Sequence, residues 1–172
     1  MTAPTDRHLS GQSGYTLVEL IVAVALGALL MGAMVSVFLT TTRATDNAIG
    51  RVEASGQIRN FEYFAYEDFA GSNAADFDSS CTASVPCQSQ VALTEIKFDN
   101  PAQTYTVTYG WDQSRNVLDR TVGTAPPLYA ATNVTGYQWY LDPNGTVVVT
   151  LTITVKSYTD SQTFRFYPRR DP

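Results

Sequence analysis

The sequence predicts an α+β protein in which one long N-terminal α-helix packs on a C-terminal antiparallel β-sheet. Two observations support this fold class. An uncharged apolar run is followed by helical spacing of apolar residues as far as residue 71, and the spacing changes to a period of two from residue 91. The length of 172 residues allows one small domain attached to one membrane anchor.

The first element is an apolar run over residues 20–42, in which no side chain is charged. As a helix, this run would extend about 35 Å, which is enough to cross a hydrocarbon core of about 30 Å. We therefore expect a membrane-spanning helix. The alternative is a cleavable secretory signal, whose apolar region is usually only about 7 to 15 residues long and follows a basic segment. Here the run is longer, and the acidic Glu19 directly precedes it.

Helical spacing continues beyond the apolar run. Apolar residues recur at intervals of three and four, which predicts one face that packs on the domain. This face consists of Ile49, Val52, Ile58, Phe61, Ala65 and Phe69. Gly50 and Gly56 each weaken a helix by about 1 kcal/mol relative to alanine, so we expect a bend or a frayed turn near them. Gly71 predicts the end of the helix.

Runs rich in valine, threonine and aromatic residues predict the strands of an antiparallel sheet in the C-terminal half. These runs cover residues 91–99, 103–112, 116–122, 133–142, 146–158 and 162–168. The sequence DPNG at 142–145 predicts a tight turn between the fourth and fifth runs. In the fifth run aliphatic residues alternate with threonines, so one face should cover the helix and the other should meet solvent.

Cys81 and Cys87 are the two cysteines of the chain, and they lie in a stretch rich in Ser and Ala that reads as a loop. Two cysteines are too few for a structural zinc site, which takes four Cys or His ligands. We favour a disulfide that closes this loop, which indicates an oxidising compartment outside the inner membrane. Two free buried thiols are the alternative.

The usual catalytic residue sets are missing from the sequence. The one histidine, His8, precedes the apolar run, so the rest of the chain offers no Ser-His or Cys-His pair. We therefore predict no catalytic residues, cofactor or resident metal, and no enzymatic activity. The acid pairs Glu67 and Asp68, and Asp76 and Asp78, could bind calcium, but the EF-hand pattern is absent. A solvated acidic loop is the simpler interpretation.

Two polar features of the C-terminal half have alternative interpretations. Asn133 and Asn144 fit the glycosylation acceptor pattern, although positions in strands and turns explain them more simply. Arg165, Arg169 and Arg170 lie among aromatic residues and could contact nucleic acid. An edge strand with a basic end is the simpler reading in a chain of net charge −5. DNA is thus a partner that the sequence allows but does not support.

The motif GYTLVEL at residues 14–20 resembles the class III leader of type IV prepilins and type II secretion pseudopilins. The resemblance implies that a membrane aspartyl peptidase cuts after Gly14 on the cytoplasmic side and methylates the new N-terminus at Tyr15. Tyr15 departs from the phenylalanine that is usual in the family. Glu19 would become the fifth mature residue, on the same helix face as Tyr15 and one turn away, where its carboxylate can meet an amine.

The same resemblance implies three segments and a pilin-like fold. Residues 1–14 would be a cleaved cytoplasmic leader, 15–42 the transmembrane half of the first helix, and 43–172 an extracytoplasmic head. The protein would reside in the inner membrane and then in a filament at the periplasm or cell surface. Its implied partners are the prepilin peptidase, other pilin or pseudopilin subunits, the inner-membrane assembly platform and membrane lipid.

The expected function is that of a minor pilin or pseudopilin in a type IV pilus, a type II secretion pseudopilus or a DNA-uptake filament. The strand order around an L-x-R sequence at 118–120 resembles minor pilins of the J or W kind, which favours a subunit that primes or tips the filament. The alternative is a signal-anchored extracytoplasmic ligand-binding domain that enters no filament. Processing after Gly14 distinguishes the two, because a simple anchor does not need it.

Overall fold

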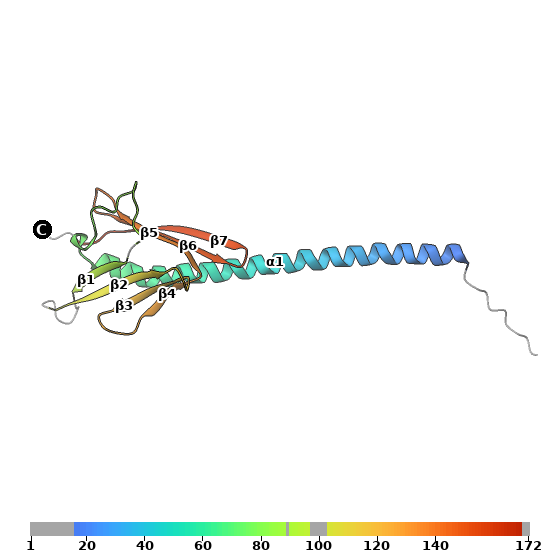
Figure 1. Cartoon of the computed structure of the whole chain (residues 1–172), viewed down its shortest axis with the longest axis horizontal. Helices are drawn as coiled ribbons and strands as arrows, with labels where there is room; N and C mark the ends of the chain where they lie inside the picture. The colour runs from blue at the N-terminus through green and yellow to red at the C-terminus, as the bar shows by residue number, and fades with distance from the viewer. Residues whose placement is uncertain (1–15, 89, 97–102, 170–172) are drawn as a thin grey trace, which may run out of the picture. The chain divides into compact units, whose positions relative to one another are not determined.

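The computed structural model describes residues 16–88, 90–96 and 103–169. The chain divides into two compact units, Met1–Arg43 and Ala44–Pro172. The helix α1, Leu17–Gly71, belongs to both units, and the second unit adds a short 3-10 helix, η1 Ala74–Asp76, and seven strands (Figure 1). The predicted α+β class is confirmed, with a long N-terminal helix and antiparallel sheets.

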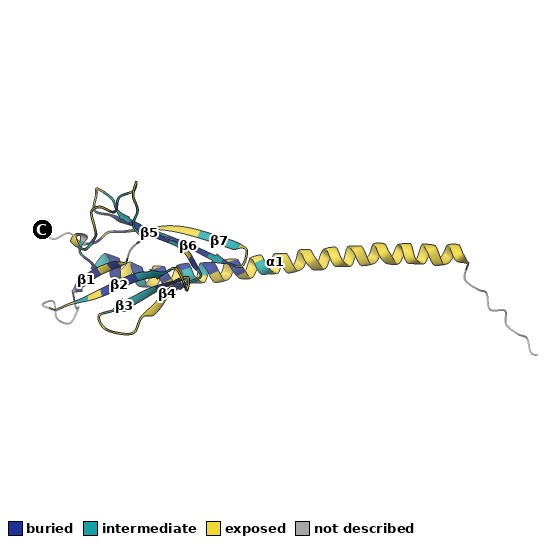
Figure 2. Ribbon diagram, viewed as in Figure 1, coloured by how far each residue is buried: buried dark blue, intermediate teal, exposed yellow. Residues whose placement is uncertain are grey.

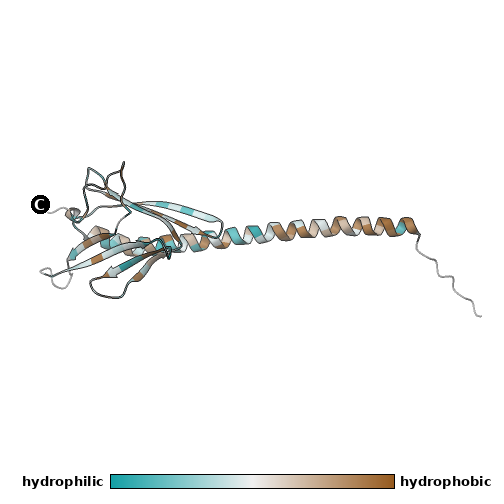
Figure 3. Ribbon diagram, in the orientation of Figure 1, coloured by the Kyte–Doolittle hydropathy of each residue, from teal (hydrophilic) through white to brown (hydrophobic). Residues whose placement is uncertain are grey.

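In the first unit, the side chains of α1 point outward around the whole helix. Every residue over 16–43 is exposed (Figure 2), and most of these residues are apolar (Figure 3). By length and composition this helix could cross a membrane, and none of its most apolar window is buried. An apolar helix surface that the described residues leave exposed requires another apolar environment, such as lipid or the helices of other subunits.

Two antiparallel sheets, ordered β1-β2-β3-β4 and β5-β6-β7, are present in the second unit. The strands are β1 Val91–Ile96, β2 Thr104–Asp112, β3 Val117–Val122, β4 Leu128–Thr132, β5 Val134–Leu141, β6 Val147–Val155 and β7 Tyr158–Phe166. The prediction of a single sheet is therefore wrong. The chain changes sheet at Asn133, where a φ of 58° turns the backbone between β4 and β5.

Each of the six predicted runs overlaps a strand of the structure, but β4 was not predicted and the run at 162–168 omits the first four residues of β7. The turn at Asp142–Gly145 is confirmed, since Gly145 N donates to Asp142 O at 2.7 Å and Gly145 has a φ of 75°. The fifth predicted run was too long, because Lys156 has a φ of 54° and turns the chain from β6 into β7. Strand β4 could not be recognised in the sequence, because its five residues lack the alternation of apolar and polar side chains.

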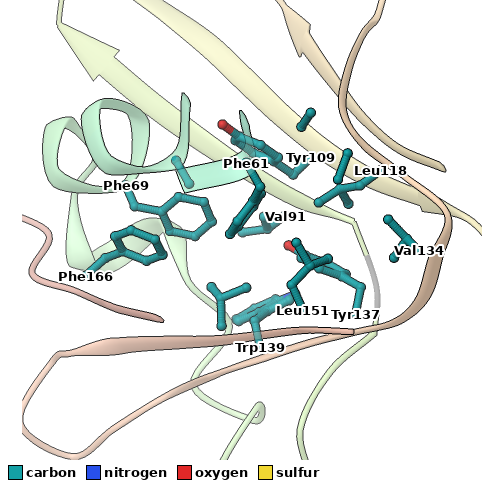
Figure 4. Close-up of a cluster of buried hydrophobic side chains, with 14 of the residues drawn as sticks. Phe61, Phe69, Val91, Tyr109, Leu118, Val134, Tyr137, Trp139, Leu151 and Phe166 are labelled. Carbon is teal, nitrogen blue, oxygen red and sulfur yellow. The ribbon is translucent and has the colours of Figure 1, made fainter. Parts of the chain in front are cut away.

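The core of the second unit lies between α1 and both sheets. Phe61 of α1 contacts Tyr109 of β2 and Phe164 of β7, with ring centroids 6.0 Å and 5.3 Å apart. Phe69, about two turns further along the same helix face, stacks on Phe166 with centroids 4.7 Å apart (Figure 4). The aliphatic face of β6 completes this core, as its alternation predicts; it comprises Val147, Val149, Leu151, Ile153 and Val155.

The buried face of α1 differs from the prediction at its N-terminal end. Ile49 and Val52 are 46% and 74% exposed, so they do not belong to the core. Gly50 and Ala54 are buried instead. A Cβ atom on Gly50 would lie only 2.9 Å from the carbonyl oxygen of Val155, so this side of the helix needs its smallest residue. The helix is also continuous through Gly50 and Gly56, where the sequence predicts a weak turn.

Candidate functional site

The start of α1 is the first candidate site, and Thr16 caps it. The Glu19 N–H donates to Thr16 Oγ1 at 3.3 Å, and the Leu20 N–H donates to Thr16 O at 3.2 Å. Thr16 and Glu19 have the T-x-x-E spacing of a capping box, which places a carboxylate at the positive end of the helix dipole. Our sequence interpretation missed Thr16, although this spacing is visible in TLVE. Gly14 and Tyr15 lie outside the described residues, so cleavage and methylation stay predictions.

Three threonines close the apolar run, and the helix satisfies each of their hydroxyl groups. The Oγ1 atoms of Thr40, Thr41 and Thr42 each donate to the carbonyl oxygen four residues earlier, at 2.9 Å. A hydroxyl that bonds its own helix needs no water, so it costs less in an apolar environment. The polar end of the run is thus compatible with a position at or within a membrane.

The predicted disulfide joins Cys81 and Cys87. The loop that it closes also pairs with strand β5. Cys87 and Trp139 exchange two backbone hydrogen bonds of 2.8 Å, and the Leu141 N–H donates to Cys81 O at 2.9 Å. The disulfide loop therefore covers the outer edge of β5, an arrangement that the spacing of the cysteines does not reveal.

Asp76 and Asp78, one of the acid pairs considered for calcium binding, accept backbone hydrogen bonds. Asp76 Oδ2 accepts from the Thr94 N–H at 2.7 Å, which joins η1 to β1. Asp78 Oδ1 accepts from the Ser80 N–H at 2.8 Å, and this backbone hydrogen bond lowers the pKa of Asp78. Within the described ranges, no group of three or more His, Cys, Asp or Glu side chains is placed to hold a metal ion.

A buried ion pair that sequence reasoning missed connects α1 to the first sheet. Asp68, which is 3% exposed, binds Arg120 of β3 through Nε at 2.6 Å and Nη2 at 2.7 Å. The Tyr109 hydroxyl donates to the same carboxylate, and the Arg120 guanidinium lies 5.1 Å from the centroid of the Phe64 ring. The interpretation of Asp68 as a solvated acid is therefore wrong. Its burial is stable because every charge has a partner.

A second carboxylate, Glu95 of β1, adjoins this ion pair. Burial raises the pKa of Glu95 to about 7, and the nearby charge of Asp68 acts in the same direction. The Tyr105 hydroxyl donates to Glu95 Oε2 at 2.5 Å, and this hydrogen bond raises the pKa of Tyr105 to about 12. Glu95 is thus buried beside a second carboxylate, so it holds a proton more readily than an exposed glutamate does.

The polar residues considered for glycosylation or nucleic-acid binding have local structural roles. Asn133 donates from Nδ2 to Glu53 Oε1 at 3.1 Å, and Asn144 donates to Asp142 Oδ1 within the β5–β6 turn. Arg169 donates from Nη2 to the Gly71 carbonyl oxygen at 2.6 Å and so caps the end of α1. Arg165 is exposed on β7, whereas Arg170 lies outside the described residues.

A hollow of about 320 Å³ lies on the outer face of β2 and β3. It is lined by Gln90, Thr108, Gly110, Trp111, Asp112, Asp119, Thr121 and Pro127. Arg115 forms ion pairs with both acids of this lining, at 2.6 Å to Asp112 and 2.9 Å to Asp119. The single guanidinium offsets only one of the two carboxylates, so the hollow keeps a net negative charge.

Comparison with known proteins bears on the N-terminal site. A family model described as the prokaryotic N-terminal methylation motif matches residues 9–35. No curated protein and no solved structure matches the chain. The matched segment contains Gly14, Tyr15, Glu19 and the first part of the apolar helix. This motif is the class III leader signature of type IV prepilins, and it identifies the chain as a protein with a type IV pilin-like N-terminus.

Proposed function

We propose that the protein is a minor pilin or pseudopilin, a structural subunit that enters a filament through its N-terminal helix. The observation that carries this proposal is that the methylation motif leads directly into an apolar helix whose surface is exposed among the described residues. The membrane holds the precursor, the prepilin peptidase removes residues 1–14, and the helices of successive subunits then pack together on the inner-membrane assembly platform.

Glu19 acts in this assembly as the partner of an amine. After cleavage, Tyr15 carries the new amino group, and Glu19 lies four residues further along the helix. An unpaired charge in an apolar surrounding is costly, about 2.5 to 3.5 kcal/mol at a bilayer centre and less near the interface. Pairing with the Tyr15 amine, of the same subunit or of a neighbour, removes this cost and fixes the register of docking.

The head of the subunit, 43–172, is exported in this scheme. Its disulfide supports that location, because disulfides form and persist in oxidising compartments. The net charge of −5 over the whole chain gives no basis for non-specific binding to DNA, so we assign the protein no DNA contact. A role at the tip or in priming, as opposed to the filament body, rests on the resemblance to minor pilins of the J or W kind.

Processing after Gly14 tests the proposal. Mass spectrometry of the protein isolated from its native host should give a mature N-terminus at Tyr15 with an added methyl group. Replacement of Gly14 by a bulky residue should block cleavage and leave the precursor in the membrane, while Ser13→Ala, one position upstream, should be processed normally. An intact leader in the wild-type protein would instead favour the signal-anchored binding domain.

A further inference from the structure

The hollow on the outer face of β2 and β3 has an open floor at Gly110. This glycine lies within β2, opposite Asp119 of β3, and pairing of the two strands is regular there. A Cβ atom at this position would meet only the Gln90 side chain within 4 Å among the described residues, at 3.9 and 4.0 Å. The φ of Gly110 is not positive, so the backbone does not require glycine. A glycine inside a regular strand is typical of a place that another group approaches closely.

The missing side chain leaves space between Gln90 and Asp119. Neighbouring strands are about 4.8 Å apart, so groups on the two sides of β2 are separated by roughly 10 Å. Thr108 and Thr121, a cross-strand pair, line the hollow beside this space. The volume of about 320 Å³ is near the lower end of ligand sites, which is about 300 Å³. The hollow therefore has room for one small organic group.

Asp119 is the charged wall of the hollow, and its charge is only partly neutralised. Its Oδ2 accepts from Arg115 Nη2 at 2.9 Å, whereas its Oδ1 is buried and accepts no hydrogen bond from the described residues. Arg115 also donates from Nε to Asp112 Oδ2 at 2.6 Å, so one guanidinium serves two carboxylates. A buried polar atom without a partner is rare in folded proteins, and a bound water or ligand commonly accounts for it.

We propose that the hollow binds a primary alkylammonium group, with the ammonium at Asp119 and the alkyl chain over Gly110. An ammonium group brings a positive charge and three N–H donors, which suit a carboxylate with an unused oxygen and the neighbouring threonine hydroxyl groups. Arg115 is 52% exposed and keeps its bond to Asp112, so an entering ammonium can displace it from Asp119. Free amines and lysine side chains of other proteins share this chemistry.

A divalent cation fits the hollow less well. Calcium takes about six to eight oxygen ligands, including several carboxylates. The lining contributes two carboxylates, and Asp112 already accepts from Arg115 and from the backbone N–H of Ser114. The site belongs to the second unit, and amine binding there does not depend on leader processing or on assembly into a filament.

A ligand titration of the full-length chain in detergent micelles, followed by the amide NMR signals of Gly110 and Asp119, tests the proposal. n-Butylammonium should give saturable shifts at both amides. Tetramethylammonium has the charge without N–H donors, and butan-1-ol has the chain without the charge, so each should bind about tenfold more weakly or less. Saturation by N-acetyl-lysine methylamide as well would point to a protein lysine as the source, and saturation by n-butylammonium alone to a free amine. The absence of saturable shifts, equal binding of tetramethylammonium, or binding of calcium in place of the amines would overturn the proposal.

Four variants separate the site from a general effect of charge. Asp119→Asn should lower the affinity for n-butylammonium about tenfold. Gly110→Val fills the floor with a side chain that suits a strand, so the variant should fold and lose binding. Arg115→Ala removes the competing cation and should bind several-fold more tightly. Asp78→Asn is the control, because it changes the net charge equally at an exposed acid outside the hollow and should bind as the wild type does.

Near-ultraviolet circular dichroism verifies that each variant is folded. Wild-type affinity in folded Asp119→Asn or Gly110→Val would refute the site, and so would an equal loss in Asp78→Asn. Weaker binding by folded Arg115→Ala would contradict the competition between Arg115 and the ligand for Asp119.

Discussion

Asp68 of α1 and Arg120 of β3, 52 positions apart in the sequence, form a bidentate ion pair in the interior of the second unit. The pair ties the helix to the first sheet, and its surroundings exclude most of the solvent, since the two side chains are only 5% and 15% exposed. Such a pair contributes chiefly through the cost of breaking it, because removing one partner leaves a buried charge uncompensated.

Arg120→Ala should destabilise the protein by about 3 to 5 kcal/mol, because Asp68 would remain buried without a counter-charge. Arg115→Ala is the matched control: Arg115 also forms ion pairs, but its side chain is 52% exposed, so the loss should be at most about 1 kcal/mol. Denaturant unfolding in detergent micelles, followed by near-ultraviolet circular dichroism, measures both. Similar losses in the two variants would show that the Asp68–Arg120 pair does not stabilise the fold.

Glu95 should make stability depend on pH. Its pKa rises from an ordinary 4.5 to about 7 in the folded protein, so the folded state binds a proton that the unfolded state releases. The stabilisation is fully present below pH 4.5 and is lost as the pH rises through about 7. The free energy of unfolding should therefore fall between pH 5 and 8, and this component should disappear in Glu95→Gln. If the free energy of unfolding falls with pH as steeply in Glu95→Gln as in the wild type, Glu95 is not the source of the pH dependence.

Gly50 and Gly56 lie in the same helix, yet alanine should have opposite effects at the two positions. At Gly56 an added Cβ meets nothing within 4 Å, so Gly56→Ala should stabilise by up to about 1 kcal/mol. At Gly50 the Cβ would lie 2.9 Å from the Val155 carbonyl oxygen and 3.0 Å from Tyr158 Cβ. Gly50→Ala should cost about 1 to 3 kcal/mol through the forced backbone shift. Thermal unfolding measures the change in stability of both variants. A stabilising effect of Gly50→Ala would contradict the close approach of Gly50 to Val155 and Tyr158.

Removal of the disulfide should weaken the second unit and uncover β5. The variant Cys81→Ser and Cys87→Ser should lose about 2 to 2.5 kcal/mol, the value expected when a loop of this length is no longer closed. Ser84→Ala, within the same loop, is the control and should change stability by less than about 0.5 kcal/mol. Hydrogen exchange should also accelerate at the amides of Trp139 and Leu141, which bond the loop. Unchanged exchange there would show that the loop stays on β5 without the disulfide.

Glu19→Gln tests the assembly role of the carboxylate. Glutamine also suits the third position of a capping box, so the variant removes the charge and preserves the helix start. It should insert into the membrane and be cleaved as the wild type is, yet fail to enter filaments. Thr16→Ala removes the capping oxygen at a cost of about 1 kcal/mol but keeps the carboxylate, and it should still assemble. Filament incorporation of Glu19→Gln at the wild-type level would disprove the pairing with the Tyr15 amine.

Features that depend on a local residue pattern could be predicted from the sequence. The apolar run, the motif around Gly14 and Glu19, the turn at 142–145 and the buried face of β6 follow from spacing along one segment, where composition and period decide the outcome. The predicted disulfide belongs here as well, since a short loop brings Cys81 and Cys87 together whatever surrounds them.

Contacts between distant segments could be known only from the folded structure. The division into two sheets depends on the left-handed backbone of Asn133, a single dihedral angle that no periodicity reports. The partner of Asp68, the raised pKa of Glu95 and the need for glycine at position 50 arise from contacts between segments far apart in the chain. A residue pattern specifies which face of an element is buried, whereas packing and turn geometry determine what that face contacts, because close packing admits few arrangements of the same elements.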